Sequence, residues 1–199
     1  MNFLAHIYLS GDSDELKIGN FIADSVKGKQ YLNFPDEIQK GIVLHRAIDT
    51  FTDTHPIVSK SVQRLFERYG HYSRVIVDIL YDHFLAANWK DYSEIPLKNY
   101  TEEFYSLLQE NFKVLPKPVQ NFLPYMIADN WLYNYRKIDG IEKILFQMNR
   151  RIKFRAKMHL AVEELREFYE EFENEFRMFF EELRVYVKVE LNLKKKQEE

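Results

Sequence analysis

Three polar stretches interrupt apolar segments in the first half of the chain. The most informative is His45-Arg46-Ala47-Ile48-Asp49-Thr50-Phe51-Thr52-Asp53, in which His45, Asp49 and Asp53 are spaced four apart. In a helix, this interval stacks the side chains on one face. An imidazole and a carboxylate one turn apart can bind the same divalent cation. The alternative is a surface histidine–aspartate pair that is hydrogen-bonded for structural reasons alone.

The second stretch is Asp78-Ile79-Leu80-Tyr81-Asp82-His83-Phe84. Asp78 and Asp82 share a helix face, and His83 follows directly. Carboxylates on a helix this apolar are costly to bury unless they are paired, hydrogen-bonded or bound to a metal. A buried histidine can equally be a hydrogen-bonded core residue. Both interpretations stay open for this stretch.

The third stretch is Gly19-Asn20-Phe21-Ile22-Ala23-Asp24, with His6 upstream. Asn20 and Asp24 lie one turn apart on a predicted helix. Alone, this spacing is weak evidence, because such pairs are common on solvated faces and His6 could be structural. The joint presence of three stretches with Asp or His on apolar faces favours a shared site.

The composition limits the ligands of such a site. The chain contains no cysteine, so a metal must be held by histidine, aspartate, glutamate or water. That donor set indicates a hard or borderline divalent ion.

The rest of the chain predicts a single-domain, all-α helical bundle. A length of 199 residues fits one domain, and 46% hydrophobic residues with 16 Phe and 13 Tyr can fill a packed interior. Between only 6 Gly and 6 Pro, apolar residues recur at spacings of three and four. We expect seven or eight helices, including ones near residues 35–52, 57–69, 72–89, 97–112, 119–135 and 138–151, and a last one from Ala156.

The last predicted helix carries an aromatic stripe that we interpret as a core or dimer face. Its members are Leu165, Phe168, Phe172, Phe176, Phe179 and Leu183. Apolar residues then alternate at period two over 185–193, which is typical of a strand but lacks a partner strand. We therefore expect a fraying helix end or an extended tail, and divide the chain into a domain over 1–190 and a charged tail over 191–199.

Targeting and charge features predict a cytoplasmic protein with neither a membrane nor a nucleic acid as partner. The N-terminus lacks a positively charged start followed by an apolar run, and no segment reaches about 18 uncharged apolar residues. The net charge is -3, and no nucleic-acid-binding motif is evident.

The ordered polar motifs resemble those of the acyl carrier protein phosphodiesterase family. The resemblance rests on Asn2-Phe3-Leu4-Ala5-His6, Gly19–Asp24, His45–Asp53 and Asp82-His83-Phe84-Leu85, with Trp131-Leu132 and Tyr135-Arg136 further on. It covers about residues 1 to 180. The family is described as a divergent relative of metal-dependent phosphohydrolases named for a His-Asp dipeptide. This chain has no such dipeptide, because Asp82-His83 runs in the opposite order.

The resemblance implies a divergent HD-like fold and a metal-dependent hydrolysis. Holo-acyl carrier protein would be converted to apo-protein with release of 4'-phosphopantetheine, using Mn²⁺ or Mg²⁺. The implied metal ligands are Asp24, His45, Asp82 and His83, with His6 and Asp49 as close alternatives.

The remaining roles are assigned to charged residues near these ligands. Asp49 or Asp78 would orient water or a ligand histidine, and Arg46 would bind a phosphate oxygen. Arg46 could instead form a salt bridge with a neighbouring acid.

A strongly acidic carrier predicts a basic docking surface on this chain. The densest positive segment is Arg150-Arg151-Ile152-Lys153-Phe154-Arg155-Ala156-Lys157. It could also be a solvated helix end, and the docking surface would then be expected around Lys17, Lys27 and Lys29. Two other functions stay open at this point. One is a metal-dependent phosphohydrolase acting on a nucleotide or another small phosphoester, and the other is a non-catalytic helical interaction module.

Overall fold

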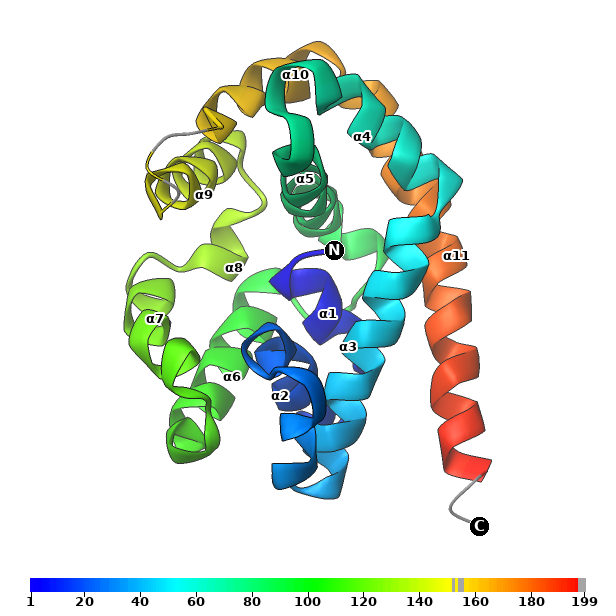
Figure 1. The fold of residues 1–199 in the computed structure, drawn as a ribbon, viewed down its shortest axis with the longest axis vertical. Coiled ribbons are helices and arrows are strands. Elements are labelled where there is room, and N and C mark those ends of the chain that lie inside the picture. The colour runs from blue at the N-terminus through cyan, green and yellow to red at the C-terminus, as the bar shows by residue number, and fades with distance from the viewer. Residues whose placement is uncertain (152, 154–155, 197–199) are drawn as a thin grey trace.

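The computed structural model describes residues 1–151, 153 and 156–196. Within them the chain forms eleven α-helices, several short 3₁₀ turns and no β-strand, which confirms the all-α prediction (Figure 1). The buried apolar side chains form one cluster that draws on nearly every helix. The helices are α1 (Phe3–Leu9), α2 (Asp14–Ile22), α3 (Asp36–Thr54), α4 (Pro56–Tyr69), α5 (Ser73–Ala87), α6 (Leu97–Glu110), α7 (Lys117–Ala128), α8 (Trp131–Asn134), α9 (Ile138–Arg151), α10 (Ala161–Glu167) and α11 (Tyr169–Lys196).

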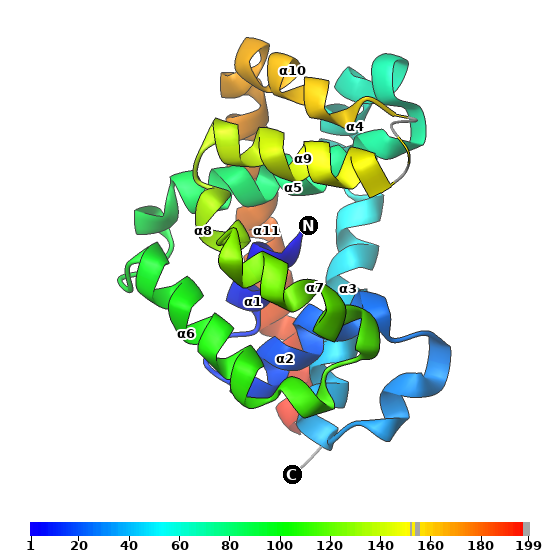
Figure 2. The same cartoon turned by 90° about the vertical axis from the view of Figure 1, so that its left-hand side faces the viewer.

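The short helix α1 lies in the middle of the molecule and packs against α2 and α5 (Figures 1 and 2). The long helices α3 and α11 run side by side, and α11 also contacts α4 and α5. The α11 residues Phe172, Phe176, Phe179 and Leu183 are fully buried, so the predicted aromatic stripe belongs to the core.

Helix α3 begins and ends where its sequence predicts. Pro35 precedes it, and Asp36 and Glu37 place negative charge in its first turn, where the helix dipole is positive. It ends at Thr54 because Pro56 already starts α4. Helix α4 in turn ends at Tyr69, and the next residue, Gly70, has a positive φ of 54°.

Two predicted helices are wrong in their extent. The segment 119–135 is divided, because Asn130 adopts a left-handed backbone with φ 46° between α7 and α8. The C-terminal helix does not start at Ala156 either. It is preceded by the separate helix α10, and the break falls at Phe168, whose N–H still bonds Glu164 O.

The period-two segment 185–193 is helical, and α11 passes the predicted boundary at 190 without a break.

Among the described residues, none of the helices combines the length and the apolar character that crossing a bilayer requires.

Candidate metal centre

Two histidines from different helices are stacked in the interior, next to the buried Asn20. The rings of His6 on α1 and His45 on α3 lie 4.0 Å apart between centroids, with an interplanar angle of 19°. His6 Nδ1 is 2.8 Å from Asn20 Oδ1, and His45 Nδ1 is 2.8 Å from the Asn20 main-chain carbonyl oxygen. Asn20 therefore holds each of the two rings by its Nδ1 atom.

The hydrogen bonds of Asn20 determine which nitrogen of each histidine carries a proton. Asn20 Nδ2 donates to His6 O at 2.9 Å and to Ser10 Oγ at 3.0 Å, so Oδ1 is the atom that faces His6. Carbonyl oxygens only accept hydrogen bonds, which makes both Nδ1 atoms donors. In the neutral ring, Nε2 then carries the free lone pair, the form in which histidine binds metals.

The two Nε2 atoms converge on Asp49. Asp49 Oδ1 is 3.3 Å from His6 Nε2, and Asp49 Oδ2 is 3.0 Å from His45 Nε2. One ligand atom from each of the three residues lies within 4.8 Å of the others. His6 Nε2 is buried and makes no hydrogen bond of good geometry to any described residue. A buried nitrogen in this state fits a divalent cation held by these three side chains.

Asp24 closes the exposed side of the cluster. Its Oδ1 lies 3.2 Å from His45 Nε2, and its side chain is 74% exposed. Asp24 is therefore placed either to complete the ligand set or to contact a water or substrate atom that arrives from solvent.

The electrostatics of the cluster correspond to a site that holds positive charge. Burial alone would lower the pKa of His45, but the carboxylates of Asp24 and Asp49 raise it to about 9. Burial and the neighbouring His45 charge lower the pKa of His6 to about 4. Burial would raise the pKa of Asp49, but the close approach of the two histidines lowers it well below its ordinary value. Without a metal, a proton on His45 thus supplies the positive charge.

A close helix crossing brings Asn20 and His45 together. A Cβ at Gly19 would lie 2.1 Å from Ile38 O, and one at Gly41 would lie 2.4 Å from Leu16 O. Only glycine allows α2 and α3 to approach this closely. Asn20 follows one of these glycines directly, and His45 lies one turn after the other.

The predicted ligand Asp82 has other partners in this structure. Its carboxylate accepts hydrogen bonds from the main-chain N–H groups of Asn2 at 3.2 Å, Leu4 at 2.7 Å and Ala5 at 3.2 Å. It thereby caps the N-terminus of α1, the helix that carries His6. Burial raises the pKa of Asp82 to about 7, opposed by the α-ammonium of Met1 and by these N–H groups.

His83 also bonds away from the cluster. Its Nδ1 is 2.7 Å from Tyr135 O, and its Nε2 is 3.2 Å from the Tyr169 hydroxyl. Burial lowers its pKa, so the ring is neutral between these partners. The structure therefore unites His6, His45, Asp49 and Asp24, but not Asp82 or His83, and the ligand role of the last two stays a prediction.

Two further predicted residues lie next to the cluster. Asp78 Oδ1 is 2.8 Å from the buried α-ammonium of Met1. Arg46 Nη2 donates to Val26 O at 3.2 Å and to Gly28 O at 2.9 Å, which holds the loop that follows Asp24.

Sequence reasoning identified Asn20 as a polar residue but missed its role in orienting the histidines. A signal was present, because an amide inside the apolar run Ile18-Gly19-Asn20-Phe21-Ile22 must find partners once it is buried.

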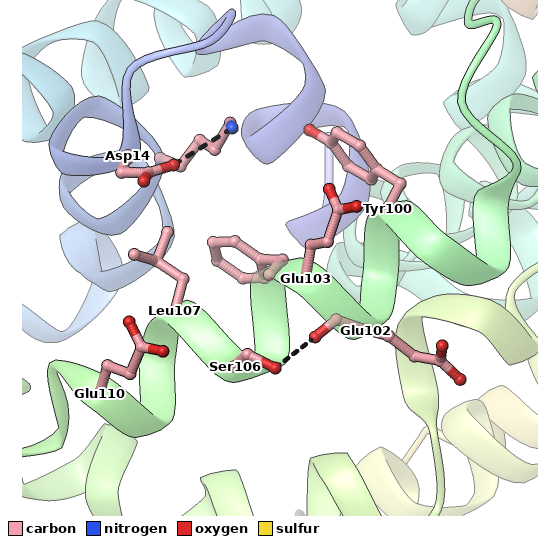
Figure 3. A pocket seen from close by; sticks show the side chains of 9 residues that line it. Asp14, Tyr100, Glu102, Glu103, Ser106, Leu107 and Glu110 are labelled. Atoms are coloured by element: carbon pink, nitrogen blue, oxygen red, sulfur yellow. Dashed lines mark hydrogen bonds and ion pairs between the residues drawn. The ribbon is translucent and has the colours of Figure 1, made fainter.

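A cavity of about 310 Å³ adjoins the cluster and shares Asp24 with it. A different cavity, of about 450 Å³, lies between α2 and α6 (Figure 3). Four acidic residues line this second cavity and none of the histidines does, so its charge is unsuited to a phosphate group. Its acidic residues are Asp14, Glu102, Glu103 and Glu110.

A family model for acyl carrier protein phosphodiesterase matches residues 1–183. This chain belongs to the acyl carrier protein phosphodiesterase family. Membership confirms the resemblance seen in the motifs and the prediction of an enzyme of the phosphodiesterase class.

Relatives named acyl carrier protein phosphodiesterase align along most of their length. The protein from Pectobacterium atrosepticum is 31% identical over 181 residues, which is 90% of this chain and 94% of the relative. The protein from Yersinia pestis is 34% identical over 158 residues, 78% of this chain and 82% of the relative. The protein from an Enterobacter species is 29% identical over 189 residues, 94% and 98% respectively. No solved structure matches the chain.

Proposed function

We propose that this chain is a metal-dependent hydrolase that cleaves the phosphodiester of holo-acyl carrier protein and releases 4'-phosphopantetheine. The proposal combines the family with one structural observation. Both histidines donate through Nδ1 to Asn20, and their Nε2 atoms face the Asp49 carboxylate. A preformed set of imidazoles and a carboxylate is typical of metal-assisted phosphoester hydrolysis.

In this proposal His6, His45 and Asp49 hold the ion. Two imidazoles and a carboxylate suit Mn²⁺ better than Mg²⁺, which prefers oxygen ligands. A bound divalent ion neutralises the phosphodiester charge and lowers the pKa of a coordinated water.

The other residues position the reacting groups. Asp24 is exposed beside His45 and orients the attacking water at the open side of the cluster. We assign Arg46 to holding the loop after Asp24, because its Nη2 already donates to two carbonyl oxygens there. Asp82 supports the site because it caps α1, the helix that carries His6. Asp78 supports it because it pairs with the Met1 ammonium at the start of the same helix.

The acidic carrier requires a basic surface close to Asp24. The predicted segment 150–157 is only partly described: Arg150 and Lys153 are exposed, whereas Ile152, Phe154 and Arg155 lie outside the described residues. Lys27 and Lys29 are also exposed, and they lie in the loop that follows Asp24. We favour this loop for docking, because the scissile phosphate of the carrier must reach Asp24, which directly precedes the loop. A cytoplasmic location remains a prediction.

The decisive experiment treats purified protein with holo-acyl carrier protein and Mn²⁺ and measures the carrier by mass spectrometry. We expect the mass to fall by the phosphopantetheinyl group, and EDTA to prevent the change. Turnover of nucleotides or small esters with no change in the carrier would instead support a small-phosphoester hydrolase.

A further inference from the structure

We propose that the cavity beside Asp24 is the subsite that receives the pantetheine arm during cleavage. This inference rests on the proposed function and adds the place where the departing group is held. The cavity lies among the start of α1, α5, α8 and α9, and Asp24 connects it to the metal centre. A phosphodiester at Asp24 would therefore have one of its two substituents directed into the cavity.

The lining matches the alternating chemistry of a pantetheine chain. That chain carries two amides, a hydroxyl, a gem-dimethyl group and a terminal thiol. The cavity offers apolar side chains from Phe3, Val75, Ile144 and Met148 and amide groups from Asn2 and Gln147. Apolar walls with a few polar groups that fix orientation are typical of small-molecule sites.

The charges of the lining favour a neutral ligand over a nucleotide. No Lys or Arg is present among the described residues that line the cavity. Its one cation, the Met1 α-ammonium, is already 2.8 Å from Asp78. A polyphosphate would need unpaired cations, whereas the pantetheine arm is uncharged beyond its phosphate.

The size and rigidity of the cavity agree with this occupant. Its volume of about 310 Å³ is near the lower end of the roughly 300 to 1,000 Å³ found for ligand sites. One wall is braced by the hydrogen bond from Asn2 Nδ2 to the Tyr135 hydroxyl, at 3.1 Å. A rigid cavity that adjoins the metal centre would hold the pantetheine arm while the phosphate lies at Asp24.

The first test uses nuclear magnetic resonance of protein labelled at its methionine methyl groups. Free pantetheine, which lacks the phosphate, is the probe. Met148 lines the cavity, whereas Met178 is exposed on α11 and serves as the internal control. We expect pantetheine to shift the Met148 signal and leave the Met178 signal in place. No shift at Met148, or a larger shift with adenosine monophosphate, would overturn the assignment.

The second test fills the cavity. Met148→Trp should lower kcat/KM for holo-carrier by roughly tenfold or more, because the arm can no longer enter in the productive pose. The affinity for Mn²⁺, measured by calorimetry, should stay like that of the wild type, because Met148 is not among the residues that hold the ion. Leu107→Trp, in the acidic cavity of Figure 3, is the matched control and should change neither quantity.

The outcomes separate the two proposals. If the wild-type protein fails to cleave holo-carrier with Mn²⁺, the proposed function is wrong. If the wild type cleaves it and a folded Met148→Trp protein does so equally well, only the subsite is wrong. Should that variant not fold, the methionine spectra of the wild-type protein still decide the question.

Discussion

The side-chain oxygen of Asn20 lies 2.8 Å from Nδ1 of His6, and this bond fixes the tautomer that leaves Nε2 free. Asn20→Ala should therefore weaken Mn²⁺ binding by roughly 10- to 100-fold, the usual cost of losing a hydrogen bond to a ligand histidine. Isothermal titration calorimetry measures the loss. Asn121→Ala, at an exposed position on α7, should bind Mn²⁺ like the wild type. Equal affinity in both variants would show that Asn20 has no role in the metal site.

Substitution of single histidines tests the ligand set. His6→Ala and His45→Ala should each abolish high-affinity Mn²⁺ binding, because each removes one of three donors. His83→Ala should bind the metal normally and lose stability instead, since His83 bonds Tyr135 O and the Tyr169 hydroxyl. Loss of Mn²⁺ from the His83 variant, in protein with wild-type circular dichroism, would restore His83 as a ligand.

Asp82→Ala should lower the free energy of unfolding by about 1 to 3 kcal/mol, because three main-chain N–H groups lose their buried acceptor. Urea denaturation followed by circular dichroism measures this effect. Asp12→Ala, at an exposed turn position, is the control and should change stability little. A variant at Asp82 as stable as the control would falsify the capping role.

Metal binding should release about one proton near neutral pH. The pKa of His45 is raised to about 9 in the metal-free protein, so its ring is protonated below that pH and must lose the proton to bind a metal. His6, with a pKa near 4, is already neutral there. The dissociation constant for Mn²⁺ should therefore rise roughly tenfold for each unit that the pH falls between about 8 and 6.

Calorimetry in two buffers of different ionisation enthalpy measures the proton release directly. His71→Gln is the control, because it removes an exposed histidine outside the cluster and should leave the proton release unchanged. An affinity that does not depend on pH between 6 and 8 would contradict a protonated His45 in the free site.

Charge reversal distinguishes the two candidate docking surfaces. Lys27→Glu with Lys29→Glu should raise KM for holo-carrier several-fold at low salt and leave kcat nearly unchanged, because steering charges act on encounter. The difference should shrink as salt screens the exposed charges over about 8 Å.

Two further pairs complete this test. Lys90→Glu with Lys188→Glu changes the net charge equally at other exposed positions and should leave KM unchanged. If Arg150→Glu with Lys153→Glu raises KM and the Lys27 and Lys29 pair does not, docking occurs at the segment predicted from the sequence.

The sequence predicted the parts of this protein that depend on local spacing. His45 and Asp49 meet at 3.0 Å because four residues make about one helical turn. The limits of α3 follow from its prolines and its acidic first turn. Local spacing also identified Asp82 as a carboxylate that needs partners inside an apolar helix.

The rest depends on contacts between distant segments. The partners of Asp82 are main-chain N–H groups about 80 residues away, which no motif encodes. The break at Asn130 depends on a backbone conformation that asparagine permits but does not require. Asn20 can bind the rings of both His6 and His45 only when α2 and α3 pack against each other, which no local pattern predicts.

The crossing at Gly19 and Gly41 makes the histidine geometry a property of the main chain. A side chain can rotate away from a new methyl group, but two backbones in contact can only move apart. Any such separation would carry Asn20 away from His45 without an intervening element to absorb it. The distance between Asn20 and His45 therefore depends directly on the separation of the two backbones. Gly19 and Gly41, which have no side chains, determine that separation.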